Sequence, residues 1–124
     1  MTKAMPPSRR QIGILGEKLA LEHLRKRGYK IRETNFRCRE GEIDIIAQDK
    51  DYLVFVEVRT RRGSDFGTPE ESLTAAKKER LVSLALAYLQ THRNLPPSWR
   101  FDVVAIELDQ DKQISRIELI QNAI

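Results

Sequence analysis

The stretch GEIDIIAQDKDYLVFVEVRTRR, residues 41–62, decides the fold of this chain. Apolar residues alternate with acidic ones through GEIDIIAQ (41–48), which predicts a strand. The short sequence DKD (49–51) predicts a tight turn into a second strand, YLVFVEVRTR (52–61). This second strand is apolar almost without alternation, a pattern typical of strands covered on both faces. We therefore predict a hairpin whose second strand is central in a sheet.

Helical patterns lie on both sides of this hairpin. Before it, apolar residues recur at helical spacing and the run ends at a glycine, Gly28, as helices commonly do. After it, a loop punctuated by glycine and proline (62–70) leads into a longer helical pattern, which stops before Pro96 and Pro97. The expected elements, in chain order, are a helix over 12–28, strands over 29–37, 41–48 and 52–61, a helix over 69–92, and strands over 99–108 and 114–120.

The length of 124 residues favours a single domain. Residues 1–10, which include two prolines and two arginines, have no apolar anchor and are predicted to form a flexible basic arm. Residues 11–124 contain no internal repeat and no long linker. We therefore predict one α/β domain over 11–124, with the element order helix, three strands, helix, two strands.

The composition excludes several classes of protein. Hydrophobic residues make up 40% of the chain and charged residues 32%, which is a globular balance. The longest apolar runs reach about five residues, whereas a bilayer-spanning helix needs about 20, and no signal peptide is recognisable. A soluble cytoplasmic protein without membrane contact is expected. The single cysteine, Cys38, excludes an internal disulfide, and we expect it to be a half-buried strand residue.

Positive charge is concentrated at the start of the chain. The net charge is +4, but residues 1–40 contain 11 Lys and Arg against 4 Asp and Glu. Residues 41–124 contain 11 against 14. This asymmetry suggests that one surface binds a polyanion, although an ordinary solvated surface also accounts for it.

Two carboxylates stand where the sequence is otherwise apolar. Glu57 interrupts the most apolar run, and Arg59 follows on the same face because side chains two apart along a strand point the same way. Asp44 lies between Ile43 and Ile45, and we expect it on the polar face of its strand. The hairpin would bring Asp44 next to Glu57, and two neighbouring carboxylates need a cation between them. Mg²⁺ or Mn²⁺ is the natural candidate, since both prefer oxygen ligands.

Glu17 is a third candidate, because it lies at the edge of the apolar stripe of the first helix and can reach the same site. A plainer interpretation is that Asp44 and Glu57 pair with Arg37 and Arg59 on an exposed sheet face, an arrangement that contributes little energy.

These residues resemble those of the PD-(D/E)xK nuclease superfamily, whose pattern is an acid followed by acid-x-lysine on the next strand. Here the pattern is Asp44, then Glu57-Val58-Arg59, with Glu17 on a preceding helix. Short matches across residues 11–120 resemble the YraN family of uncharacterised bacterial proteins, which is similar to archaeal Holliday-junction resolvases in its predicted core. The matches are Gly16-Glu17, Asn35-Phe36-Arg37, Gly41-Glu42-Ile43-Asp44, Phe55-Val56-Glu57-Val58, Phe66-Gly67-Thr68-Pro69, Lys77 and Arg100-Phe101-Asp102-Val103.

The resemblance implies a restriction-endonuclease-like mixed central sheet flanked by helices. It also implies that Asp44, Glu57 and the backbone carbonyl of Val58 hold Mg²⁺ or Mn²⁺, which would polarise the scissile phosphate and activate a water. Glu17 would join through water. Flanking phosphates of DNA or another nucleic acid would contact basic residues, for which the candidates are Arg37, Arg39, Arg61, Arg62, Lys77 and Arg80. A homodimer fits junction-cleaving relatives, which cut two symmetric strands.

One position departs from the superfamily pattern. Arg59 stands where lysine is usual, and arginine cannot act as a base, although it can stabilise negative charge on the phosphate. The expected function is therefore metal-dependent hydrolysis of phosphodiester bonds in branched or single-stranded DNA, carried by Glu17, Asp44, Glu57 and Arg59. A nucleic-acid-binding module without catalysis is the alternative, and a protein interaction module with structural acid pairs is a third.

Overall fold

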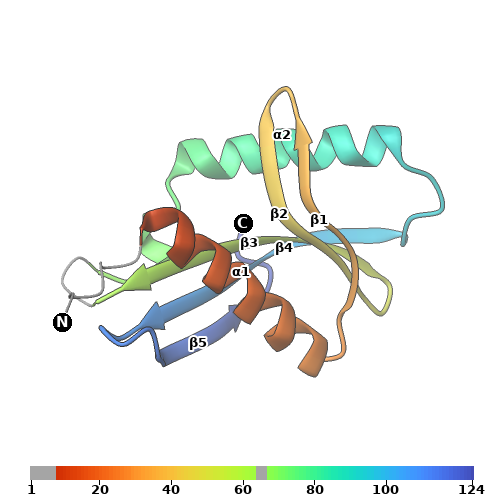
Figure 1. Cartoon of the computed structure of the whole chain (residues 1–124). Coiled ribbons are helices and arrows are strands. Elements are labelled where there is room, and N and C mark those ends of the chain that lie inside the picture. Colours follow the sequence, from red (N-terminus) through yellow and green to blue (C-terminus); the bar gives the residue numbers. More distant parts are fainter. Residues whose placement is uncertain (1–7, 64–66) are drawn as a thin grey trace.

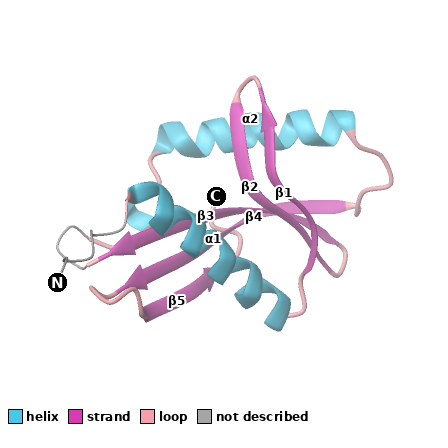
Figure 2. Cartoon of the chain, viewed as in Figure 1, coloured by secondary structure: helices cyan, strands magenta, loops and turns pink. Residues whose placement is uncertain are grey.

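The computed structural model describes residues 8–63 and 67–124 and confirms the predicted α/β order of one helix, three strands, one helix and two strands (Figures 1 and 2). A short 3-10 helix, η1, precedes the second α-helix. The elements are α1 (Arg9–Lys26), β1 (Lys30–Cys38), β2 (Gly41–Asp49), β3 (Tyr52–Arg62), η1 (Glu70–Ser72), α2 (Ala75–Thr91), β4 (Ser98–Leu108) and β5 (Ile114–Ile120).

The five strands form one mixed sheet in the order β1-β2-β3-β4-β5. Neighbouring strands are antiparallel except β3 and β4, which are parallel and paired from Tyr52–Ser98 to Arg62–Leu108. A parallel pair needs a crossover connection, and η1 and α2 supply it. The central position of β3, predicted from its continuous apolar run, is confirmed.

The helices cover opposite faces of the sheet and make a three-layer structure (Figure 1). Along β3, Val54 and Val56 belong to the core beneath α1, while Leu53 and Phe55 belong to the core beneath α2. All four side chains are buried. Both faces of the central strand are therefore apolar, which is why a carboxylate further along the same strand is an unusual feature.

The second strand departs from the prediction. Alternation predicted one apolar and one polar face for β2, with Asp44 on the polar face. Instead Ile43 and Ile46 pack in the core beneath α2, and Ile45 and Ala47 pack in the core beneath α1. Both faces of β2 are covered, so Asp44 lies at the edge of a buried environment and its side chain is half-buried.

The first helix begins inside the segment predicted to be an arm. Ser8 is its N-cap, and a capping box joins Ser8 and Gln11 through reciprocal hydrogen bonds of 3.1 and 2.9 Å. Arg9 and Arg10 are therefore helical, and residues 1–7 of the predicted arm lie outside the described residues. At the other end Gly28 has a φ of +87° and the N–H of Tyr29 donates to the carbonyl of Leu24, as the glycine predicted.

The sequence predicted that the second helix starts at about Pro69, but it starts at Ala75. The hydroxyl of Thr74 caps the helix by accepting a hydrogen bond from the N–H of Lys77, and Leu73 has an extended backbone. Of the loop predicted over residues 62–70, Arg62 instead ends β3 and Glu70 begins η1. Residues 64–66, which include Phe66, lie outside the described residues. Cys38 ends β1 and is half-buried, as predicted. Within the described parts of the chain, no helix is long and apolar enough to cross a membrane.

Candidate functional site

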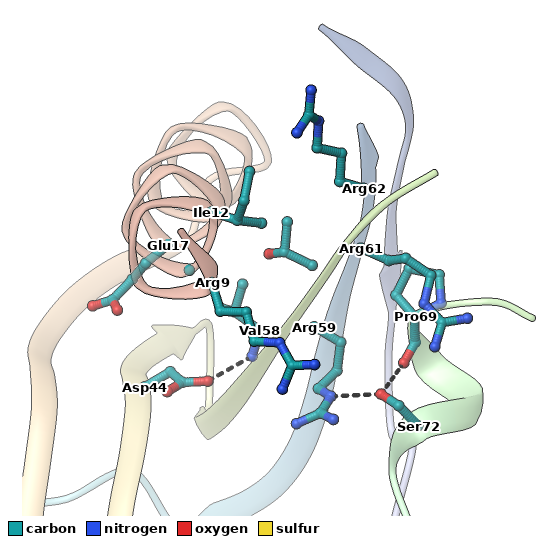
Figure 3. Close-up of a pocket in the computed structure, with 12 residues that line it drawn as sticks. Arg9, Ile12, Glu17, Asp44, Val58, Arg59, Arg61, Arg62, Pro69 and Ser72 are labelled. Carbon is teal, nitrogen blue, oxygen red and sulfur yellow. Dashed lines mark hydrogen bonds between the residues drawn. The ribbon is translucent and has the colours of Figure 1, made fainter. Parts of the chain in front are cut away.

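The site forms where β2 separates from β3. Their paired residues end at Ile45 and Val56. One residue beyond, the Asp44 carboxylate takes the place of a strand carbonyl, and its Oδ2 accepts a hydrogen bond of 2.8 Å from the N–H of Val58 (Figure 3). Because the N–H and C=O of one strand residue point to the same edge, the carbonyl of Val58 is directed toward this gap as well.

Glu57 reaches the same gap from the α2 side of β3. Its side chain is 15% exposed, and Arg59 Nη1 lies 3.3 Å from its Oε1. Glu57 lies close enough to Asp44 for its charge to raise the pKa of the Asp44 carboxyl group. The structure thus brings the two predicted carboxylates together, although they approach from different strands and different sides of the gap.

The electrostatics of the two carboxyl groups are unfavourable. Burial, together with the charges of Glu57, Glu17 and Glu42, raises the pKa of Asp44 to about 8. The hydrogen bond from the Val58 N–H lowers this pKa and so opposes part of the increase. Burial also raises the pKa of Glu57, opposed by Arg59 and by Lys77. Arg59 therefore compensates Glu57 directly, whereas Asp44 faces mainly acidic side chains. A cation in this gap would relieve that repulsion.

Glu17 reaches the site because α1 lies very close to β3. A Cβ atom at Gly16 would lie 1.9 Å from Oγ1 of Thr60, so no larger residue fits here without displacing one of the two elements. This approach places Glu17 at the mouth of the cleft that contains Asp44 (Figure 3). Its charge contributes to the raised pKa of Asp44, in agreement with the predicted third carboxylate.

Arginines line the cleft between α1 and the second half of β3. The cleft has a volume of about 660 Å³. Arg61 and Arg62, both predicted as phosphate ligands, line it and donate to the carbonyls of Gly67 and Gln110 respectively. Arg9 lines it too, although its sequence context predicted that it belongs to a flexible arm. The capping box from Ser8 to Gln11 was the signal that would have placed Arg9 in the helix.

A second hollow of about 190 Å³ lies on the α2 side of the same gap. Lys77, Arg80 and Glu57 line it, and Arg59 lines both hollows. The predicted basic residues are thus divided between two sides of the carboxylate pair. Two of the predicted basic residues lie elsewhere, on the β1–β2 hairpin. The side chain of Arg37 is 77% exposed, and its Nε lies 3.5 Å from Oε2 of Glu42. Arg39 is exposed in the turn.

Arg59 is held in place by η1. Its Nε donates to the hydroxyl of Ser72 at 2.9 Å, and that hydroxyl donates to the carbonyl of Pro69 (Figure 3). The 3-10 helix is itself anchored by Glu70, which lies 2.6 Å from a guanidinium nitrogen of Arg116 on β5. Ser72 could not be predicted from the sequence, because this contact depends on the path of the loop before α2 and leaves no local pattern.

The donor chemistry of the gap fits a hard divalent cation in part. Across residues 8–63 and 67–124, no three Asp, Glu, His or Cys side chains come close enough together to hold a metal ion between them. An ion held by Asp44 and Glu57 would take further ligands from the Val58 carbonyl and from water, which Mg²⁺ characteristically retains. All these donors are oxygen atoms, the type that Mg²⁺ and Mn²⁺ prefer.

Residues 16–106 match the model of a protein family described as "Uncharacterised protein family UPF0102". This span includes Glu17, Asp44, Glu57 and Arg59. The chain belongs to the UPF0102 family. Its relatives include a UPF0102 protein of Symbiobacterium thermophilum, 53% identical over 92% of this chain and 96% of the relative. A UPF0102 protein of Dehalococcoides mccartyi is 48% identical over 97% and 98% of the two chains, and one of Syntrophomonas wolfei is 46% identical over 92% and 97%.

Proposed function

We propose that this protein is a metal-dependent endonuclease that hydrolyses phosphodiester bonds in DNA. The observation that carries the proposal is the pair formed by Asp44 and Glu57, in which burial and mutual repulsion raise the pKa of Asp44 to about 8 beside an arginine-lined cleft. Perturbed carboxyl groups in a cleft are typical of functional sites. The resemblance to the PD-(D/E)xK superfamily supports the same chemistry and a restriction-endonuclease-like fold.

Each group has a distinct part in this proposal. Asp44, Glu57 and the Val58 carbonyl would hold Mg²⁺ or Mn²⁺, which supplies Lewis-acid polarisation of the scissile phosphate. Arg59, fixed between Glu57 and Ser72, would hold a phosphate oxygen by a charge-assisted hydrogen bond. Glu17 would orient water at the cleft mouth. The basic residues of the two hollows would hold flanking phosphates, and a homodimer would bring two such sites to paired strands.

The test is a cleavage assay over linear, single-stranded and branched DNA with Mg²⁺ and with Mn²⁺. We expect wild-type cleavage to fall at least about 100-fold in Asp44→Ala and in Glu57→Ala, because each loses a metal ligand. Mn²⁺ should raise the melting temperature of the wild type and not of these variants. Glu79→Ala is the matched control, since Glu79 is an exposed carboxylate on α2. Cleavage that persists in an Asp44→Ala, Glu57→Ala double variant would refute the proposal.

Arg59→Lys separates a catalytic from a supporting role for this position. If the side chain at 59 contacts the reacting phosphate, lysine should increase a residual rate, because an ammonium can also exchange protons. A loss of melting temperature with no change in rate would assign Arg59 to structure alone.

A second candidate is a nucleic-acid-binding module without catalysis. It is favoured by Arg59, which is already engaged by Glu57 and Ser72 and cannot act as a base. In that case DNA binding should persist in EDTA and weaken steeply with salt, as phosphate contacts do. Binding without cleavage under every metal and substrate condition would favour this candidate over the nuclease.

A further inference from the structure

We infer that Asn35 is a positioning residue for Asp44, because its left-handed backbone turns the β1–β2 hairpin at the point where Asp44 must leave the strand pairing. Asn35 has a φ of +53° in the middle of β1. A strand residue ordinarily has a strongly negative φ, and only glycine, with occasional asparagine or aspartate, adopts the left-handed region readily. A left-handed residue inside a strand therefore requires a structural explanation.

The register places Asn35 opposite Asp44. Thr34 pairs with Ile45 and Phe36 pairs with Ile43, so the two residues between them face each other across the hairpin. On its other side, the pairing of β2 with β3 has just ended at Ile45. Asp44 is therefore flanked by a left-handed residue on one strand and by the start of the gap on the other.

The β1–β2 hairpin changes sides of the sheet at this point. On β2, Ile45 belongs to the core beneath α1 and Ile43 to the core beneath α2, although side chains two residues apart on a regular strand share a face. Phe36, the partner of Ile43 on β1, also packs in the core beneath α2, with its ring centroid 5.2 Å from that of Tyr88. The end of the hairpin accordingly rises away from the plane of β3 and β4, toward α2 (Figure 1).

This change of side explains the geometry of the site. As β2 turns away from β3, the N–H of Val58 loses a strand carbonyl as partner, and the Asp44 carboxylate replaces that carbonyl at 2.8 Å. A hairpin that stayed in the sheet would pair Val58 with backbone and leave the carboxyl group on one face. The side chain of Asn35 is exposed, so its contribution lies in the backbone angle that it tolerates.

Amide hydrogen exchange of Val58, measured by NMR relative to the amide of Val56, tests the inference. Asn35→Ala should make Val58 exchange about tenfold faster relative to Val56, because alanine lacks the short polar side chain that allows asparagine to adopt a left-handed backbone. Asn35→Gly should stay within about threefold of the wild type, because glycine adopts this φ freely. Asn94→Ala is the matched control, since Asn94 is also exposed and left-handed, with a φ of +58°.

The importance of this positioning rests on the proposed function, so Mn²⁺ binding is measured on the same four proteins. Weaker Mn²⁺ binding in Asn35→Ala alone, together with faster Val58 exchange, supports the inference. Unchanged Val58 exchange in Asn35→Ala overturns it even if the wild type binds Mn²⁺. Equal loss of Val58 protection in Asn35→Gly also overturns it, because the side chain would then carry the effect. If no protein binds Mn²⁺ but Val58 responds as expected, the positioning stands and the proposed function fails.

Discussion

Asp44 on β2 and Asp102 on β4 are acidic residues of the same sheet, but the charges around them differ. Asp102 on β4 is fully buried and accepts hydrogen bonds from Tyr29 Oη at 2.8 Å, from Arg100 Nε at 3.0 Å and from the N–H of Asn122 at 3.0 Å. Asp44 accepts one hydrogen bond, from the N–H of Val58, and its nearest charges include those of Glu57 and Glu17. Asp102 has a cationic partner within the fold, Arg100, whereas in the function proposed above Asp44 would take a metal ion.

The hydrogen-bond network of Asp102 extends toward the start of β3, whereas the Asp44 site opens toward the second half of that strand. Arg100, which pairs with Asp102, reaches Asp49 at 2.8 Å and lies over the ring of Tyr52, 4.8 Å from its centroid. This network joins β2, β3 and β4 where β3 begins. The Asp44 site lies toward the other end, where β2 has already separated from β3. The Arg100 network thus lies at the start of β3, and the cleft lies along its second half.

The largest expected effect is on stability, from Asp102→Ala. Removal of this carboxylate leaves Arg100 and Tyr29 buried with fewer partners, and such a loss destabilises proteins by about 3–5 kcal/mol. Asp44→Ala should cost far less, since its removal relieves repulsion. Urea unfolding of the two variants measures the difference. Equal loss of stability in both would contradict the distinction drawn between the two carboxylates.

The next effect is a change in the pH dependence of stability. In the folded chain Asp44 keeps its proton up to about pH 8, against an ordinary value of 3.8. The folded state then binds more protons than the unfolded state between these values, so stability falls as pH rises from about 4 to 8. Asp44→Asn removes this fall, and without metal it should be more stable than the wild type at pH 8 by about 2 kcal/mol.

Thermal unfolding at pH 4, 6 and 8 in EDTA checks this prediction. The two proteins should have similar stability at pH 4, because the carboxyl group is then protonated in the folded state. If the melting temperatures of the wild type and of Asp44→Asn change with pH in the same way, the pH dependence comes from other groups.

The smallest expected effect concerns the packing that places Glu17 at the site. Gly16→Ala would force α1 away from Thr60 and should destabilise the protein by about 1.5 kcal/mol. Gly13→Ala is the matched control, since nothing lies within 4 Å of a Cβ atom there. That change should stabilise α1 by up to about 1 kcal/mol, because alanine favours helix. The opposite order of the two melting temperatures would show that the close approach is not maintained in solution.

The sequence by itself determined the element order and the central position of β3, and it predicted that Asp44 and Glu57 lie near each other on neighbouring strands. Hydrophobic periodicity carries this information, because a helix with one apolar stripe and a strand without a polar face each have few places to pack. A turn as short as that at residues 49–51 also sets the register of its hairpin, which is why Asp44 and Glu57 were expected to be neighbours. The start of α1 was readable from Ser8 and Gln11 as well.

Only the tertiary structure decided how β2 is covered, how Arg59 is held by Ser72, and which side of the gap each basic residue lines. These features depend on where the hairpin twists out of the sheet and on how the loop before α2 returns, and neither leaves a periodic signal. The alternating pattern predicted that Asp44 lies on a polar face, because it assumes that every second side chain of a strand points to the same side of the sheet. The change of side at Asn35 breaks that assumption, since a single left-handed residue alters the direction of the chain without altering its pattern of apolar residues.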